Sequence, residues 1–183
     1  IRPGPVTIHD IDGDGASEVI CCFLDDSMPA TESCKNIRIL ILDGRTGRIR
    51  REGAPIALTS SNQVFGGFVR VQVCNFRGLE TARDFLINVG SLYLALDETI
   101  EVLWSYQSDP SWTQYGKRPA YFPALGDIDD DGFDEVNGGY FVLDHEGSPL
   151  WEKQLAPHMD SVAIDEFEPG IMRAFCSGYG HVV

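Results

Sequence analysis

The sequence has no apolar run of 18 residues and almost no helical periodicity, so it predicts neither a membrane-spanning helix nor a helical bundle. Basic residues are scarce, with 14 Lys and Arg against 28 Asp and Glu and a formal net charge of −14. Because nucleic acids are bound by basic faces, this balance argues against a nucleic-acid partner. The five cysteines do not have zinc-ligand spacing, which argues against a zinc site.

The arginines gather in one short region of this acidic chain. We interpret them as a solvated strand edge, whose charges oppose edge-to-edge aggregation. They are Arg38, Arg45, Arg48, Arg50 and Arg51.

Two acidic loops share one spacing. The stretch DIDGDGASE (10–18) carries acids at its positions 1, 3, 5 and 9, and DIDDDGFDE (127–135) has acids at the same offsets. Four carboxylates within nine residues repel one another near neutral pH. A bound cation must offset part of that repulsion, or the loop must stay open to water.

The duplication favours the cation. Oxygen ligands at these offsets, with Gly15 or Gly132 after the third acid, suit Ca²⁺, which takes six to eight oxygens at roughly 2.3–2.6 Å. Strands are expected to flank the loops, so a helical EF-hand is excluded. The sequence thus predicts two Ca²⁺ sites, in which position 7 supplies its backbone carbonyl; the alternative is two acidic turns without metal. The predicted ligands are Asp10, Asp12, Asp14, Ala16 and Glu18, and Asp127, Asp129, Asp131, Phe133 and Glu135.

Short β-rich runs follow the acidic loops in a repeating order. Each unit has a strand, a loop, a second strand, a third strand ending in Leu-Asp, a tight turn and a short fourth strand. The Leu-Asp pairs are Leu42-Asp43, Leu96-Asp97 and Leu143-Asp144. The pattern predicts an all-β protein, and repetition of a four-stranded unit predicts a β-propeller with one unit per blade.

We expect four blades, and expect the chain (1–183) to be part of a larger propeller of seven or eight blades. The expected blades are 6–52, 68–104, 122–153 and 160–183. Four units are at the low end for closure. The remaining blades are expected in the same chain or in a partner chain.

The other two units lack the set of three acids. In CNFRGLE the equivalent positions hold Asn75 and Arg77, and in DEFEPGI they hold Glu166, Glu168 and Gly170. The Arg77 guanidinium could occupy the cation's place in its unit. We therefore expect the metals to be structural in two blades and dispensable in two.

The C-terminal third resembles a known family. The stretches GDIDDDGFDEVNGGYFVLD, HMDSVAIDEFEPG and SGYG are similar to the calcium-bearing β-propellers of rhamnogalacturonan lyases and, more loosely, of ulvan and related rhamnose–glucuronate lyases. The first blade shares only its DxDxDG loop, which integrin-type FG-GAP repeats also carry. The resemblance implies an extracellular, secreted or periplasmic enzyme that cleaves a uronate polysaccharide by β-elimination. At His158 the chain departs from the family's Gly-His-Gly-Asp form.

Such a reaction needs a base for the C5 proton, a cation or Arg for the C6 carboxylate, and an acid for the leaving O4. We expect His158 to be the base. Arg118 or Lys117 could hold the carboxylate, and Tyr115 or Tyr121 could act as acid or base. These residues lie in loops expected to enter the first strands of consecutive blades, and so to open on one face. The expected partner is an anionic polysaccharide, without nucleic acid or membrane.

Three alternatives stay open. A non-catalytic carbohydrate-binding or adhesion propeller would keep the metals but lack the catalytic groups. A quinoprotein-type propeller is suggested by LDGRTGRI and LDHEGSPLW, although this turn pattern docks blades in many propellers. The third is a structural module inside a multidomain secreted enzyme.

Overall fold

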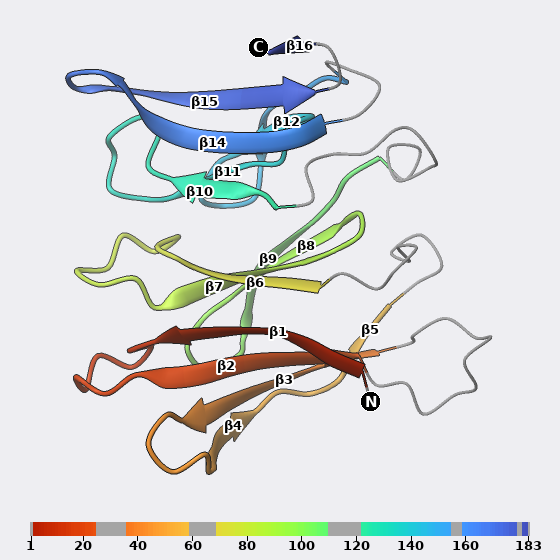
Figure 1. The fold of residues 1–183 in the computed structure, drawn as a ribbon, viewed down its shortest axis with the longest axis vertical. Coiled ribbons are helices and arrows are strands. Elements are labelled where there is room, and N and C mark those ends of the chain that lie inside the picture. Colours follow the sequence, from red (N-terminus) through yellow and green to blue (C-terminus); the bar gives the residue numbers. More distant parts are fainter. Residues whose placement is uncertain are drawn as a thin grey trace. The chain divides into compact units, whose positions relative to one another are not determined.

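The computed structural model describes residues 2–24, 36–58, 69–109, 122–154, 159–178 and 181–182. Every regular element in these ranges is a β-strand, and every pairing between strands is antiparallel, which confirms the predicted all-β class (Figure 1). No helix within these ranges is long and apolar enough to cross a membrane. The propeller and its blade boundaries stay predictions.

The strands form four sheets in which neighbours in the chain are neighbours in the sheet. The first contains β1 (Arg2–His9), β2 (Glu18–Leu24), β3 (Asn36–Asp43) and β4 (Ile49–Glu52), with β5 (Ile56–Ala57) paired to β3. The second contains β6 (Val69–Cys74), β7 (Asp84–Val89), β8 (Leu92–Leu96) and β9 (Val102–Gln107). The third contains β10 (Ala124–Gly126), β11 (Glu135–Asn137), β12 (Phe141–Leu143) and β13 (Pro149–Glu152). The fourth contains β14 (Met159–Glu168), β15 (Ile171–Gly178) and β16 (His181–Val182).

The chain divides into two compact units, which are described separately. Unit 1 comprises residues 1–73 and 81–110 and holds the first two sheets. Unit 2 comprises residues 74–80 and 111–183 and holds the other two sheets. The 74–80 segment, which follows β6, therefore packs with unit 2.

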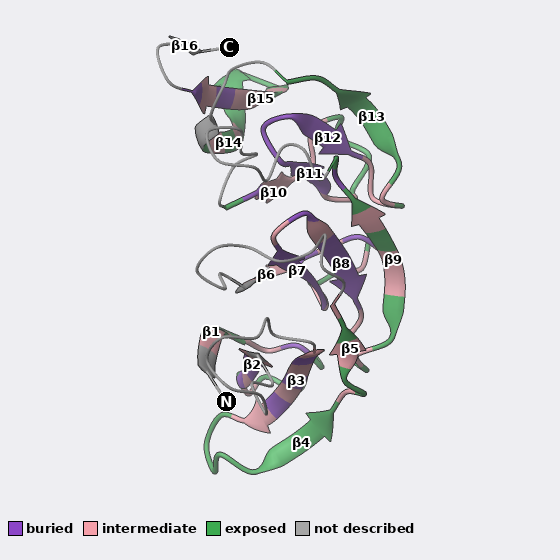
Figure 2. Cartoon of the chain, turned by 90° about the vertical axis from the view of Figure 1, so that its right-hand side faces the viewer, coloured by how far each residue is buried: buried purple, intermediate pink, exposed green. Residues whose placement is uncertain are grey.

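Burial follows strand position within each sheet. All six residues of β7 are buried, as are all residues of β11 and β12, whereas β4 and β13 are exposed along their whole length (Figure 2). A strand covered on both faces is expected to be almost continuously apolar, and the sequence of β7, DFLINV, fits that expectation. Twelve buried apolar side chains of unit 1 form one cluster of mainly branched residues. They are Ile11, Ile20, Cys22, Ile37, Ile39, Ile41, Val71, Phe85, Ile87, Val89, Leu94 and Leu96.

The Leu-Asp pairs have a clear local role, because each aspartate closes the turn between the third and fourth strands of its sheet. One carboxylate oxygen of Asp43, Asp97 or Asp144 accepts backbone N–H groups from residues two to four positions later. Aspartate is favoured in turns for this reason. In the second and third sheets the leucine before it is the buried last residue of the third strand, so there the pair marks the change from core to turn.

In unit 2, Asn137 at the end of β11 connects two sheets. Its amide nitrogen donates to the carbonyls of Ala163 on β14 (3.2 Å) and Phe175 on β15 (3.1 Å). Its amide oxygen accepts the Gly139 N–H (3.0 Å) and lies 3.5 Å from the Cys176 sulfur. The side chain is fully buried, and the contacts of its oxygen with Gly139 and Cys176 are made away from water.

We expect Asn137→Ala to lower the free energy of unfolding by about 2–3 kcal/mol, because it removes two hydrogen bonds to the next sheet and leaves the buried Gly139 N–H without its acceptor. Urea denaturation of the variant measures the loss. Ser148→Ala is the control: Ser148 is exposed and bonds Asp144 through its backbone N–H and carbonyl, which alanine keeps, so a change within about 0.5 kcal/mol is expected. An unchanged urea midpoint for Asn137→Ala would contradict this role.

Candidate metal centre

The two acidic loops have the same backbone form. In the loop at 10–18, hereafter the first loop, the Asp10 carboxylate accepts the N–H groups of Asp14 (3.0 Å) and Gly15 (2.8 Å). In the loop at 127–135, hereafter the second loop, the Asp127 carboxylate accepts those of Asp131 (3.1 Å) and Gly132 (2.8 Å). The first acid of each loop therefore holds the turn around the fifth and sixth positions.

The last acid of each loop is the first residue of a strand and is removed from water. Glu18 is 1% exposed and Glu135 is 2% exposed. Glu18 accepts the Ile11 N–H at 3.2 Å, and Glu135 accepts the Ile128 N–H at 2.7 Å. A carboxylate in this setting needs compensating positive charge or a proton, because burial disfavours its charged form.

Left-handed backbone allows both loops to turn sharply. The glycine at position 6 has φ of +84° (Gly15) or +90° (Gly132). At position 4 the first loop has Gly13, with φ +77°, whereas the second has Asp130, with φ +64°. Aspartate is one of the few other residues that adopt this conformation at modest cost.

Among the described residues, three sets of side chains have potential ligand atoms within 4.8 Å of one another. They are Asp10, Asp12 and Glu18; Asp127, Asp129 and Glu135; and Asp131, Glu135 and His145. Three of the four predicted acids therefore come together in the first loop, without Asp14, and the four acids of the second loop divide between two sets that share Glu135. The backbone N–H of the position-7 residues, Ala16 and Phe133, donates to the preceding aspartate of its own loop. Their carbonyls stay predicted ligands.

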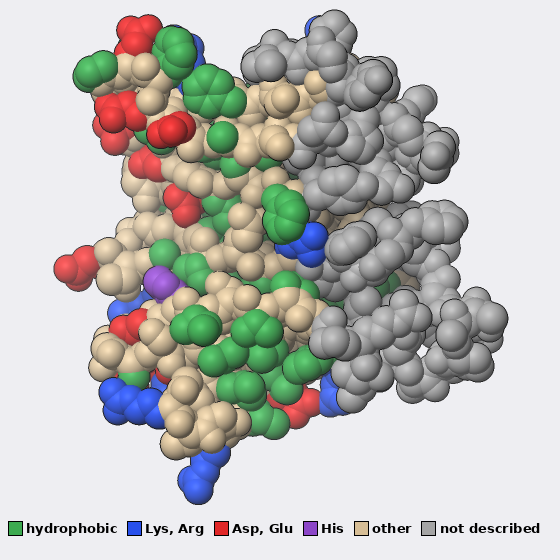
Figure 3. All heavy atoms as spheres, viewed as in Figure 1, with side chains coloured by type: hydrophobic (Ala, Val, Ile, Leu, Met, Phe, Trp, Pro, Cys, Tyr) green, Lys and Arg blue, Asp and Glu red, His purple; other side chains and the backbone are tan. Residues whose placement is uncertain are grey.

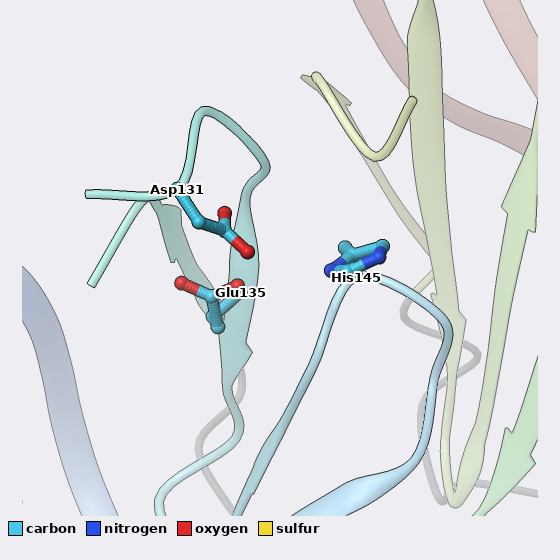
Figure 4. Close-up of side chains that lie close together, drawn as sticks. All are labelled: Asp131, Glu135 and His145. Atoms are coloured by element: carbon cyan, nitrogen blue, oxygen red, sulfur yellow. The ribbon is translucent and has the colours of Figure 1, made fainter. Parts of the chain in front are cut away.

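His145 was not among the predicted ligands, and it lies beside the second loop. Figure 4 shows the carboxylates of Asp131 and Glu135 pointing toward a common space, with the His145 ring across it on the turn between β12 and β13. The imidazole stacks on the Phe133 ring, with centroids 4.3 Å apart and 25° between the planes. Phe133 thus positions the imidazole next to the acids.

The 74–80 segment also packs on the second loop. The Asn75 N–H donates to the Asp134 carboxylate (2.7 Å), and the Asp134 N–H donates to the Asn75 carbonyl (3.0 Å). A Cβ at Gly78, which has φ +61°, would lie 2.8 Å from the Phe133 ring, so this glycine permits the contact. Within the segment, the Asn75 side chain bonds both the N–H and the carbonyl of Leu79.

The first loop contains a guanidinium. Arg50 Nη1 lies 2.7 Å from Asp12 Oδ2 and 2.8 Å from Glu18 Oε1, and its Nη2 lies 3.3 Å from Asp14 Oδ2. Arg50 thus lies on the exposed outermost strand β4, as the interpretation of a solvated edge expected, but its side chain also pairs with the acids of the first loop. Arg38 also has a partner, since it pairs with Glu52. The suggested role of Arg77 stays a prediction.

The pKa values of the two buried glutamates reflect the contact of Arg50 with Glu18. Burial, then the charges of Asp129, Asp131 and Asp127, raise the pKa of Glu135 to about 7. Burial and Asp12 also raise the pKa of Glu18, but Arg50 acts in the opposite direction. Among the described residues no Lys or Arg pairs with the oxygen donors of the second loop, and such a donor set fits a hard divalent cation.

The fourth sheet has no acidic loop at the matching place. β14 continues to Glu168 and turns tightly at Gly170, whose N–H donates to the Glu166 carboxylate (2.6 Å). Figure 3 shows acidic side chains at the edge of unit 2 where this hairpin turns, and Asp165, Glu166 and Glu168 are exposed there. As predicted, the fourth sheet lacks the set of three aspartates that the two acidic loops share.

All of the predicted catalytic residues lie outside the described residues. They are Tyr115, Lys117, Arg118, Tyr121 and His158. Their common face and their roles therefore stay predictions.

No family model matches the chain, and no curated protein matches it. Solved structures do. Rhamnogalacturonan lyase YesW matches 94% of the chain at 18% identity with a TM-score of 0.72, and the Bacillus licheniformis PL11 rhamnogalacturonan lyase matches 94% at 18% with a TM-score of 0.73. The V. cholerae biofilm matrix protein Bap1 matches 96% at 16% identity with a TM-score of 0.57.

The chain covers 35% of each of these two lyases and 24% of Bap1. At these identities the likeness shows the fold. It confirms that the C-terminal resemblance extends, as a fold, over almost the whole chain.

We expect Glu135→Gln to be more stable than the unmodified chain in excess chelator at pH 8, by on the order of 1–3 kcal/mol. The amide removes a charge that burial and three aspartates disfavour, and it keeps an acceptor for the Ile128 N–H. Denaturant unfolding with and without chelator measures the difference. Glu146→Gln, an exposed residue of the same unit, should have little effect. Lower stability of Glu135→Gln in chelator would contradict the expected charge penalty.

Proposed function

We propose that this chain is part of a calcium-stabilised β-propeller in a polysaccharide lyase that cleaves a rhamnose- and uronate-containing polysaccharide by β-elimination. The observation that carries the proposal is the match of 94% of the chain to the fold of rhamnogalacturonan lyases. The two acidic loops add support, because they place hard oxygen donors at matching positions in separate sheets.

The four sheets serve as blades in this proposal. Each is a meander of consecutive antiparallel strands, which is the form of a propeller blade. The proposed boundaries are 6–52, 68–104, 122–153 and 160–183. Because the chain covers about a third of the solved lyases, further blades would come from the same chain or a partner chain.

Calcium would bind the second loop through Asp127, Asp129, Asp131, Glu135 and the Phe133 carbonyl. The ion would supply the positive charge that the buried Glu135 lacks. The first loop offers the equivalent ligands, but there a second ion must displace Arg50. The proposed role of calcium is structural, since it would fix the turn at the start of β2 or β11.

Catalysis is proposed for residues of two segments that lie outside the described residues, 110–121 and 155–158. His158 would remove the C5 proton, Arg118 or Lys117 would neutralise the C6 carboxylate, and Tyr121 or Tyr115 would protonate the leaving oxygen. The electrons of the broken C5–H bond form the C4–C5 double bond as the C4–O4 bond breaks. A secreted or periplasmic location would give such an enzyme access to an anionic polysaccharide.

A non-catalytic carbohydrate-binding or adhesion propeller is the second candidate. The likeness to the biofilm matrix protein Bap1 favours it, since that match covers 96% of the chain. This candidate keeps the calcium loops but predicts binding without an unsaturated product.

We expect millimolar Ca²⁺ to raise the melting temperature and excess chelator to reverse the rise. An ion bound only by the folded state adds RT ln(1 + [L]/Kd), or about 2.7 kcal/mol at 100-fold excess over Kd. Asp129→Ala should reduce this shift, whereas Glu146→Ala should not. Identical melting curves in calcium and chelator would count against structural calcium.

We expect the absorbance of unsaturated uronate products to rise when the protein is incubated with rhamnogalacturonan. His158→Ala and Arg118→Ala should each lower the rate by about 10²–10⁴-fold, the usual contribution of a proton-transfer group. Arg48→Ala, at an exposed turn position, is the matched control. Polysaccharide binding without product would favour the second candidate, whereas full activity in His158→Ala would overturn the role of His158 as the base.

A further inference from the structure

Arg50 occupies a bulge that recurs in three sheets. In the first sheet Leu42 pairs with Ile49 and Ile41 pairs with Arg51, so Arg50 is the additional residue. The same register shift makes Leu103 the additional residue in the second sheet and Leu150 the additional residue in the third. A bulge redirects a side chain relative to the regular strand. The chain thus carries arginine at one bulge and leucine at the other two.

The Arg50 side chain reaches four carboxylates. Besides Asp12, Asp14 and Glu18, its Nε lies 3.4 Å from Asp43 Oδ2. Glu18 is almost fully buried, whereas the Arg50 side chain is 31% exposed. A planar guanidinium can serve several carboxylates at once, because its five N–H groups point in fixed directions. Arg50 therefore supplies positive charge to the buried Glu18 from the protein itself.

The second loop has no counterpart to this arrangement. Leu150, at the equivalent bulge, is 58% exposed and carries no charge. Within the described part of the chain, no Lys or Arg forms an ion pair with the acids of the second loop. Two loops with equivalent acids thus differ in the source of their positive charge.

We propose that Arg50 takes the place of the metal ion in the first loop and so directs calcium to the second loop. This inference rests on the proposed calcium binding. An ion entering the first loop competes with a guanidinium that already contacts three of its acids. An ion entering the second loop displaces no protein cation. The first loop is then closed without metal, and its calcium affinity is at least about tenfold weaker, since the competing contacts must first break.

The test is a reciprocal exchange at the two bulges. In Arg50→Leu the first sheet receives the residue that the other sheets carry, and in Leu150→Arg the third sheet receives the arginine. Calcium titration by calorimetry should give one tight site in the unmodified chain, and Asp129→Ala should abolish that site while Asp12→Ala leaves it. Arg50→Leu should add a second site, with a gain of about tenfold or more in affinity at the first loop. Leu150→Arg should weaken the second loop by a similar factor.

Melting in chelator provides a readout that does not depend on calcium. Arg50→Leu should melt at a lower temperature than the unmodified chain in chelator, and added calcium should restore most of the loss. Arg50→Lys keeps the charge but not the planar fork, so its effects should be intermediate. If the Arg50→Leu protein fails to fold, Leu150→Arg, whose change lies in the other unit, tests the same rule.

The outcomes separate the two proposals. Two equal calcium sites that Arg50→Leu leaves unchanged would overturn the role of Arg50 and support calcium binding. No calcium binding by any variant, together with a lower melting temperature of Arg50→Leu in chelator, would overturn the calcium proposal but support Arg50 as the counter-charge of the first loop. An unchanged melting temperature of Arg50→Leu in chelator would overturn the role of Arg50.

Discussion

Glu18 and Glu135 each place a carboxylate at the first residue of a buried strand, almost completely removed from water. An isolated charge in that position is costly, so it must be neutralised or paired. The backbone N–H groups of Ile11 and Ile128 satisfy one oxygen of each glutamate but supply no full positive charge. Each acidic loop must therefore have a further group that compensates the remaining charge of its glutamate.

The same constraint explains why equivalent loops are surrounded by different residues. In unit 1 the fourth strand of the sheet brings an arginine to the glutamate. In unit 2 the neighbouring groups are a third aspartate and an imidazole stacked on Phe133, and burial then raises the pKa of Glu135 to about 7. Sheets of similar form can therefore differ in the chemistry of their acidic loops. The first sheet carries its own cation in Arg50, and calcium is the proposed source of positive charge at the second loop.

The sequence predicted what depends on local spacing. The offsets of the acidic loops and the Leu-Asp turns are short-range patterns, and the described strands end where those patterns place the turns. It did not predict Arg50, whose contact with Asp12 spans 38 residues and depends on a bulge in β4. In the sequence, the signal that could have identified Arg50 was its alignment with Leu103 and Leu150 in the repeated units. His145 was missed for a similar reason, since its place beside Glu135 depends on stacking across a turn.

Contacts between sheets were the hardest to foresee, because no periodicity reports them. Asn137 occupies a strand position where an apolar residue would satisfy the burial pattern, yet its amide bonds carbonyls of two strands in the next sheet. A polar residue inside an otherwise apolar strand is therefore informative when its partners are backbone groups. The same reasoning applies to Asp134, which a sequence count assigns to the acidic loop but which bonds the backbone of Asn75. Acidic residues in such a loop thus divide into those that face the proposed ion and those that hold neighbouring segments in place, and only the structure separates the two.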